Sequence, residues 1–166
     1  GRDGCVSEYA VVPEEADASN RASQASVAAI GDDLGDAAAA ALGVPVFTAL
    51  MCLERAQRAG AGLEGAHVLV TAASGAVGIV ALQLAKLMGA ARVVAAGRDA
   101  ERLGRAGELG ADAVVPLLDG VGSDELQQAA EGRLDVVLDP LWGAPARAAI
   151  EALTRDGVYV SFGQAA

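Results

Sequence analysis

Cysteine, histidine and aromatic residues are scarce in this 166-residue chain. The scarcity of cysteine and histidine limits the metal sites and disulfides that the chain could form. The two cysteines, Cys5 and Cys52, lie far apart and form no CxxC pair, which excludes a four-cysteine zinc site within the chain. Two isolated cysteines also favour a reducing compartment over a disulfide framework. His67 is the single histidine, and we expect it to be an ordinary residue at the edge of a strand. The sequence therefore predicts no metal site within this chain.

Basic residues are also few: 12 Lys and Arg stand against 22 Asp and Glu, for a net charge of −10. No Lys/Arg cluster offsets this charge, so we expect no binding to nucleic acid or to anionic lipid. Charged residues, Gly or Pro interrupt every apolar run before it is long enough to span a membrane. The N-terminus lacks the layout of a signal peptide. We therefore expect a cytoplasmic protein, in which backbone amides and one or two arginines would suffice to bind an anionic cofactor.

What the chain does contain is a regular alternation of strands and helices from Gly65 onward. Five short β-branched runs predict strands at 67–72, 92–96, 113–117, 135–139 and 158–162. Helical patterns lie between them, near 76–89, 99–109, 123–131 and 144–153, with Asp99 and Ser123 as expected N-caps. Strands that are apolar on both faces are typical of parallel sheets covered on both sides. The sequence predicts a doubly wound α/β domain (Rossmann-like) over residues 61–166, with five strands present.

The first forty residues are expected to form no unit of their own. CVSEYAVVP predicts a short strand that ends at Pro13, and a helix is expected after Asp36, over residues 37–42. Gly43 and Pro45 are expected to interrupt it before a second helical segment reaches Gly60. At the other end, a six-stranded dinucleotide fold would need one more strand than the chain holds. We therefore expect the chain to be part of a larger protein.

The turn after the first strand of the α/β domain is rich in glycine. It reads Ala73-Ser74-Gly75-Ala76-Val77-Gly78, a G-x-G-x-x-G pattern with alanine in place of the first glycine. Gly75 would let the backbone approach a pyrophosphate, and Gly78 would let the helix pack closely on the strand. The alternative is a tight turn whose glycines serve packing alone. Because the pattern follows a predicted strand and opens a helix, we favour a dinucleotide site.

The end of the second strand bears on which dinucleotide would bind. An NAD site usually has Asp or Glu about 20 residues after the glycines, but here Gly97 stands there and Arg98 follows. A missing carboxylate and a neighbouring arginine favour the 2′-phosphate of NADP(H). Alternatively, Arg98 is a solvated loop residue and Asp99 contacts the ribose, although Asp99 is more simply a helix cap. Arg102 is a weaker second candidate for the phosphate.

These motifs together resemble the medium-chain dehydrogenase/reductase superfamily, specifically its zinc-free quinone oxidoreductase (zeta-crystallin-like) branch. That branch has a stretch similar to G-x-x-V-L-V-x-A-A-x-G-G-V-G-x4-Q-x-A-K. The residues in register are Gly65, Val68, Leu69, Val70, Ala72, Ala73, Gly75, Val77, Gly78, Gln83, Ala85 and Lys86. Ala76 departs from the pattern, where the branch usually has glycine. EYAVVP, ALGVPVFTAL, LGADAVV, DVVLDPLWG and DGVYVSFG resemble further segments of the same proteins.

The resemblance implies a domain division and further site residues. Residues 1–42 would be the end of a GroES-like catalytic domain, 43–60 a connecting helix, and 61–166 the dinucleotide-binding domain without its last strand. Thr48 would approach the nicotinamide, although its hydroxyl could instead bond a preceding carbonyl. Phe162 and Gly163 would lie along the nicotinamide's other side. Val44 occupies the position from which zinc-dependent relatives take a metal ligand.

The end of the fourth strand allows competing interpretations. Asp139 and Leu141 lie there, where ligands bind in such sheets, but Asp139 could equally cap the next helix. We expect Trp142 to be a packing residue under the loop.

The implied activity is zinc-independent hydride transfer from NADPH to a quinone or other conjugated carbonyl compound, with no proton donor that we can name. One alternative is an enoyl-reductase module acting on acyl-thioesters. Another is a non-catalytic, crystallin-like protein that binds NADPH. The resemblance also implies a homodimer for the full-length protein.

Overall fold

The computed structural model describes residues 31–118 and 121–163. The chain divides into two compact units, Gly1–Ala40 and Ala41–Ala166. Of the first unit only residues 31–40 are described, so the strand expected to end at Pro13 lies outside the described residues. The second unit holds the sheet and the helices that cover it.

Helix α1 (Asp36–Arg58) runs without a break through Gly43 and Pro45, so the predicted interruption is wrong. A proline inside a helix removes one N–H, and here the carbonyl that loses its partner belongs to Ala41. Ala41 is exposed, so water can satisfy that carbonyl in place of the missing N–H. The helix therefore tolerates Pro45 because the affected turn faces solvent.

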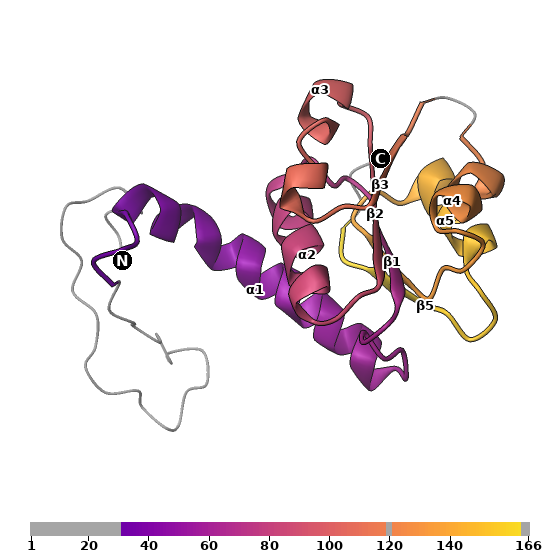
Figure 1. The fold of residues 1–166 in the computed structure, drawn as a ribbon, viewed down its shortest axis with the longest axis horizontal. Helices are drawn as coiled ribbons and strands as arrows, with labels where there is room; N and C mark the ends of the chain where they lie inside the picture. Colours follow the sequence, from indigo (N-terminus) through magenta and orange to yellow (C-terminus); the bar gives the residue numbers. More distant parts are fainter. Residues whose placement is uncertain (1–30, 119–120, 164–166) are drawn as a thin grey trace. The chain divides into compact units, whose positions relative to one another are not determined.

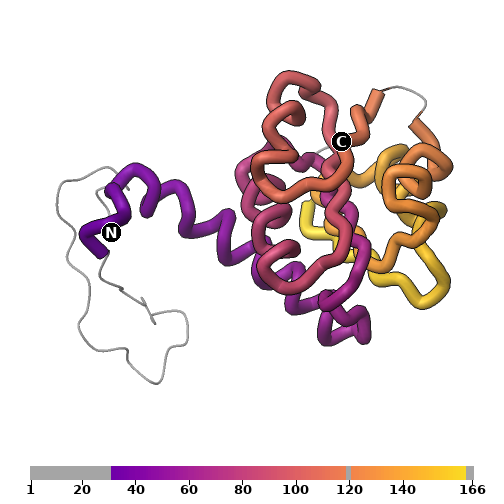
Figure 2. Tube along the Cα trace, in the orientation of Figure 1, coloured from indigo at the N-terminus to yellow at the C-terminus, as the bar shows by residue number. Residues whose placement is uncertain are grey.

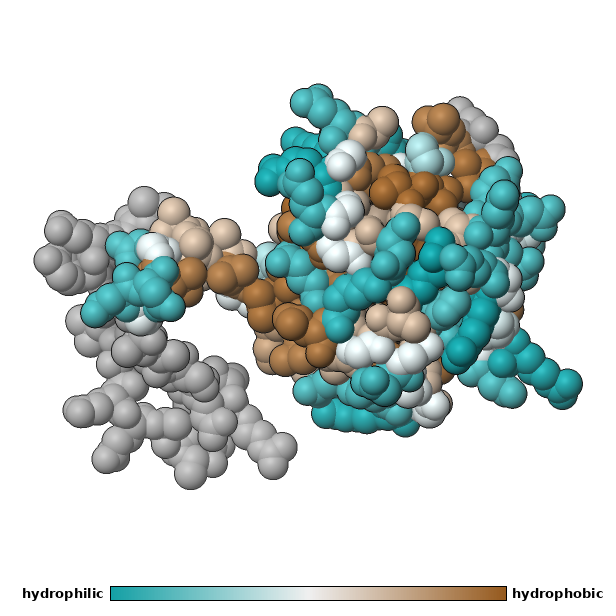
Figure 3. Space-filling model, in the orientation of Figure 1, coloured by the Kyte–Doolittle hydropathy of each residue, from teal (hydrophilic) through white to brown (hydrophobic). Residues whose placement is uncertain are grey.

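The exposed side of α1 is apolar after Ala40. Val44 is 76% exposed and Phe47 64%, and Figure 3 shows hydrophobic surface along this helix. In the described part of the chain, α1 is the one helix long and apolar enough to cross a membrane by length and composition, with a mean hydropathy of 1.8 over its best window. The prediction that no apolar run reaches that length is therefore wrong, because it counted Gly43 and Pro45 as interruptions. Only 17% of that window is buried, and the four buried side chains of α1 are Ala49, Cys52, Leu53 and Ala56.

Five parallel strands form one sheet, as the sequence predicts (Figure 1). Their order in the sheet is β3-β2-β1-β4-β5. Leu69 in the central strand pairs with Val94 on one side and with Val137 on the other. The observed strands differ from the predicted ones by no more than two residues at either end. They are β1 (His67–Val70), β2 (Arg92–Gly97), β3 (Ala113–Pro116), β4 (Val136–Asp139) and β5 (Val158–Ser161).

Helices cover both faces of the sheet, which confirms the doubly wound fold (Figures 1 and 2). Alternate residues of each central strand point to opposite faces: Val68 and Val70 pack with α1 and α2 (Ala76–Leu87), whereas Leu69 packs with α4 (Ser123–Ala129) and α5 (Gly143–Ala152). Both faces are therefore buried, which explains the uninterrupted apolar runs of the strands.

The helix predicted over 99–109 is shorter than expected. It consists of α3 (Ala100–Leu103) and a 3₁₀ turn, η2 (Gly107–Leu109), followed by Gly110 at a φ of +98°. Three glycines in seven residues lower the helical propensity of this stretch, which explains the split. The Asp99 carboxylate accepts the Arg102 N–H and caps α3 as predicted. At α4 the N-cap is Gly122, one residue before the predicted Ser123, and the Glu125 carboxylate accepts the Gly122 N–H.

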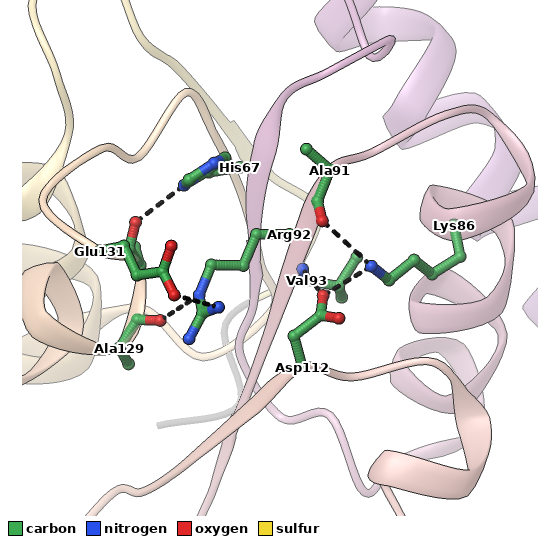
Figure 4. A network of polar contacts seen from close by, with 9 residues as sticks. His67, Lys86, Ala91, Arg92, Val93, Asp112, Ala129 and Glu131 are labelled. Atoms are coloured by element: carbon green, nitrogen blue, oxygen red, sulfur yellow. Dashed lines mark hydrogen bonds and ion pairs between the residues drawn. The ribbon is translucent and has the colours of Figure 1, made fainter.

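Hydrogen bonds and ion pairs connect the amino ends of β1, β2 and β3 to the ends of α2 and α4 (Figure 4). His67 Nδ1 lies 2.8 Å from the Ala130 carbonyl oxygen, and the Asp135 carboxylate accepts the His67 backbone N–H. His67 is therefore a structural residue at a strand end, as expected.

Lys86, the last residue of the resemblance motif, ties α2 to the start of β3. Its ammonium group lies 2.6 Å from a carboxylate oxygen of Asp112 and also donates to the Ala91 carbonyl. The same Asp112 oxygen accepts the Val93 N–H at 2.7 Å. Burial raises the pKa of Asp112, but the Lys86 hydrogen bond, the Val93 N–H and the charges of Lys86 and Arg92 together hold it below its ordinary value. Lys86 thus serves the fold at the end of the sheet opposite the glycine turn.

Candidate cofactor site

The strands β1 and β4 are neighbours in the sheet, and the helical connections on the two sides of this pair cover opposite faces of the sheet. The connections β1–β2 and β2–β3 run through α2 and α3, whereas β3–β4 and β4–β5 run through α4 and α5. In open α/β sheets, ligands bind in the crevice at this point, outside the carboxyl ends of the strands. The glycine turn lies here because it follows β1 directly.

Gly78 brings α2 close to β1. A Cβ placed on Gly78 would lie 2.5 Å from the Ala72 carbonyl oxygen and 2.7 Å from the Ala73 Cα. Both atoms are backbone and cannot move aside without shifting the strand. Gly75 is less constrained, since its Cβ would meet the Ala72 carbonyl oxygen at 3.3 Å. The structure therefore gives Gly78 the packing role that the motif predicts.

The backbone N–H groups of the turn divide into two sets. Gly75 donates to the Ala72 carbonyl at 2.9 Å and Ala73 donates to the Ala96 carbonyl at 2.9 Å, so both are used within the fold. Ala76, Val77 and Gly78 are the first three residues of α2, where N–H groups have no carbonyl acceptor inside the helix. Gly75 and Ala76 are exposed. The free donors and the positive end of the helix dipole together favour an anion at this position.

A groove of about 320 Å³ extends from this turn across the ends of β1 and β2. It brings together four predicted residues, Ser74, Gly75, Gly97 and Arg98. The remaining residues that line it are Ala72, Asp99, Arg102 and Leu141. Ala72 has a φ of +50°, which is uncommon for alanine, and sequence reasoning missed it because nothing in its residue type signals that conformation.

The two arginines of the groove differ in their partners. Arg98 is exposed, whereas the Arg102 guanidinium lies 3.2 Å from the Asp99 carboxylate. Arg102 and Ser74 also line a neighbouring groove of about 310 Å³ together with Arg105. Any side chain at position 97 would contact Leu103 closely, because Leu103 Cδ2 lies 3.3 Å from the Cβ that Gly97 lacks. Leu103 would have to shift by a few tenths of an ångström to admit such a side chain.

Other predicted residues do not line this groove. Ala73 is buried beneath the turn, Val77 packs against the core, and Ala76 and Gly78 contribute backbone N–H groups at the start of α2. Thr48 is half-buried on α1. Phe162 and Gly163 follow β5, where Gly163 is packed against Pro140: a Cβ there would lie 2.8 Å from the Pro140 carbonyl oxygen.

Asp139 is a fully buried carboxyl group at the carboxyl end of β4. It accepts hydrogen bonds from the hydroxyl groups of Thr71 and Tyr159 and from the backbone N–H of Trp142. Burial and the hydrogen bond to Asp139 raise the pKa of Tyr159, which therefore stays protonated as a donor. Asp139 thus holds the turn before α5. Trp142 is 54% exposed, so the expectation that it packs beneath the loop is wrong.

Within residues 31–118 and 121–163, no group of three or more His, Cys, Asp or Glu side chains could hold a metal ion. Cys52 is buried on α1, and this burial raises the pKa of its thiol and disfavours the thiolate that binds metals. Val44 is exposed on the same helix and has no donor atom.

The fold and the turn define a Rossmann-like domain of the dinucleotide-binding type. The model of the zinc-binding dehydrogenase family matches residues 76–166, and the chain belongs to this family. Its resemblance to the medium-chain dehydrogenase/reductase superfamily, predicted from the glycine turn, is confirmed.

Two solved structures and one curated protein illustrate the similarity. The quinone oxidoreductase of Thermus thermophilus, solved alone and with NADPH, is 34% identical with a TM-score of 0.70, over 81% of this chain and 42% of that one. A mycobacterial protein solved with NADPH is 25% identical with a TM-score of 0.72, over 81% of this chain and 41% of that one. A phenolphthiocerol/phthiocerol polyketide synthase protein of Mycobacterium tuberculosis is 33% identical over 141 residues, which are 83% of this chain and 6% of that protein. The chain thus spans less than half the length of each of these proteins.

Proposed function

We propose that this chain is the cofactor domain of an NADPH-dependent oxidoreductase that transfers hydride to a quinone or another conjugated carbonyl compound. The observation that carries the proposal is the groove at the glycine turn. There the N-terminus of α2 offers free N–H donors, Gly97 replaces the acidic residue of NAD sites, and Arg98 stands exposed beside it. The similarity to two proteins solved with NADPH supports NADP(H) as the cofactor.

Each predicted residue receives a role in this proposal. The pyrophosphate lies on the N–H groups of Ala76 and Val77, with Ala73 and Ser74 shaping the turn beneath it. Gly75 and Gly78 allow the close backbone approaches, and Gly97 and Arg98 accommodate the 2′-phosphate. By the resemblance alone, Thr48, Phe162 and Gly163 line the nicotinamide region. NADPH supplies the hydride, and the chain binds and orients it.

We propose that the activity is independent of zinc, because Val44 replaces the metal ligand that zinc-dependent relatives place at the corresponding turn. A valine side chain has no atom that coordinates a metal. We also propose a cytoplasmic homodimer for the full-length protein, without affinity for nucleic acid or membranes.

An enoyl-reductase module acting on acyl-thioesters is the second candidate. The 33% identity to a polyketide synthase protein, over most of this chain, favours it specifically. Both candidates use the same hydride donor and differ in the acceptor. Comparing turnover of a quinone with turnover of an enoyl-thioester by the full-length protein separates them. NADPH binding without turnover of either would favour the non-catalytic, crystallin-like alternative.

The cofactor assignment is tested by calorimetric titration with NADPH and NADH. Because a hydrogen bond to a charged group is worth about 1.5–3 kcal/mol, Arg98→Ala should weaken NADPH binding by about tenfold to a hundredfold and leave NADH binding nearly unchanged. Arg147→Ala serves as the control, since Arg147 is an exposed residue of α5 paired with Glu151 and lines neither groove. A tenfold preference of the wild-type chain for NADH would contradict the assignment.

A further inference from the structure

The turn between β4 and α5 holds its tryptophan in a strained conformation. Trp142 has a φ of +70° and a ψ of −174°, a region that is essentially restricted to glycine. Such a conformation costs about 1–3 kcal/mol and persists only where the surrounding structure enforces it. An interaction that holds Trp142 in place is therefore required.

Asp139 provides that interaction. One oxygen of its carboxyl group accepts the Trp142 N–H at 2.9 Å and the Tyr159 hydroxyl at 2.6 Å, and the other accepts the Thr71 hydroxyl. Because Asp139 is fully buried and receives donors from three directions, its carboxyl group has one orientation available. Its position is set by Thr71, which directly follows β1, and by Tyr159 of β5.

Of the two residues between Asp139 and Trp142, Leu141 faces the cofactor groove. Leu141 lines that groove together with Gly75 and Arg98, although it is only 7% exposed and packs against the core beside α5. A change in the turn would move Leu141 and alter the shape of the groove. Asp139 itself does not line the groove; it acts on the groove through Leu141 in the turn, and its contact with Thr71 lies next to Ala72, which also lines the groove.

We propose that Asp139 is a positioning residue of the cofactor site: it holds Trp142 in its strained conformation and thereby keeps Leu141 against the groove. The inference rests on the proposed function, because the site it serves is the NADPH site. Asp139 touches neither the hydride nor the acceptor in this role. The effect on binding follows from the geometry of the turn.

Two substitutions of Asp139 test whether its hydrogen bonds, rather than the stability of the fold, support the groove. Asp139→Asn keeps the role, because the amide oxygen can accept the Trp142 and Tyr159 donors while the amide NH₂ donates to the Thr71 hydroxyl oxygen. Asp139→Ala removes all three contacts. Val136→Ala is the matched control, since Val136 is fully buried at the other end of the same strand and loses packing without touching the turn.

The experiment measures amide hydrogen exchange of Trp142 in the nucleotide-free chain and NADPH binding by calorimetry. We expect the Trp142 N–H to be protected in the wild type and in Asp139→Asn and exposed in Asp139→Ala. We expect Asp139→Ala to weaken NADPH binding at least tenfold, which is about 1.4 kcal/mol. Asp139→Asn and Val136→Ala should stay within about threefold of the wild type.

Three results overturn the inference. The first is an unprotected Trp142 N–H in the wild type, which is decisive even if Asp139→Ala does not fold. The second is unchanged NADPH binding in a folded Asp139→Ala, and the third is an equal loss of binding in Val136→Ala. If the wild-type chain binds no NADPH, the proposed function fails, whereas Trp142 exchange still decides whether Asp139 holds the turn.

Discussion

Gly78 shows at the scale of one residue how tightly the turn is built. We expect Gly78→Ala to lower the free energy of unfolding by about 1–3 kcal/mol, because its Cβ would overlap the backbone of Ala72 and Ala73 at 2.5–2.7 Å. NADPH binding should weaken as well, since α2 would shift away from β1. Urea denaturation and calorimetry measure the two effects.

Gly43→Ala is the matched control for this substitution. Gly43 lies inside α1, has no atom within 4 Å of its missing Cβ, and has no positive φ. Alanine there should stabilise the chain by about 0.5–1 kcal/mol through helix propensity alone. If Gly78→Ala were as stable as the wild type, the close packing of α2 on β1 would not constrain the turn.

The roles of single residues could be predicted from the sequence where the residue type itself indicates the role. Gly78 carries the packing role that its position in the motif indicates, and Asp99 caps α3 as an aspartate before a helix suggests. Ala72 and Trp142 could not be predicted, because both adopt positive φ values that their residue types do not favour. The role of Asp139 depends on Thr71 and Tyr159, which come from two other segments of the chain.

At the scale of elements, the contact between Lys86 and Asp112 couples α2 to β3 and makes stability depend on pH. Since the pKa of Asp112 is lower in the folded than in the unfolded chain, the contact stabilises the fold fully above the unfolded-state pKa of about 4. This stabilisation is lost as the pH falls through the lower folded-state pKa. Both side chains are about one-third exposed, so solvent screens the pair.

We therefore expect Asp112→Asn to lower the free energy of unfolding at pH 7 by about 0.5–1 kcal/mol. The difference from the wild type should shrink as the pH falls below 4, which urea titrations across this range would measure. Glu108→Gln is the control, because Glu108 lies 3.8 Å from Arg105 in a pair that is mostly exposed, and its effect should be smaller. An Asp112→Asn deficit that is as large at pH 2.5 as at pH 7 would refute the charge-based explanation.

The strands were predicted more accurately than the helices for a physical reason. The central strands β1, β2 and β4 are buried on both faces of the sheet, so packing dictates their residue types, whereas the edge strands β3 and β5 have one buried position each. Helix α1 instead contains Gly43 and Pro45, and the local rules that favour a break there are overridden because the affected turn is exposed. For the stretch after β2, the prediction of one long helix was wrong in the opposite sense. Gly104 and Gly107 shorten a helix that the apolar spacing favours.

At the scale of the whole molecule, the apolar helix α1 and the acidic net charge lead to opposite predictions about membrane binding. By length and composition α1 could cross a membrane, and its exposed side carries Val44 and Phe47. Its other side contributes Leu53 and three further buried residues to the core against α2 and the sheet. Inserting α1 into a bilayer would expose that core to water, which costs about 1.5–3 kcal/mol for a large buried side chain such as Leu53. The net charge of −10 adds repulsion from anionic lipid.

We therefore expect the folded chain to remain in the supernatant when it is sedimented with neutral or anionic phospholipid vesicles. Circular dichroism and urea denaturation of the same samples would show that the core is intact. Phe47→Glu provides the control, because it changes only an exposed side chain of α1 and should leave stability nearly unchanged. Sedimentation of the folded wild type with neutral vesicles, abolished by Phe47→Glu, would instead make the exposed side of α1 a membrane-binding surface, because the buried side would still be occupied by the core.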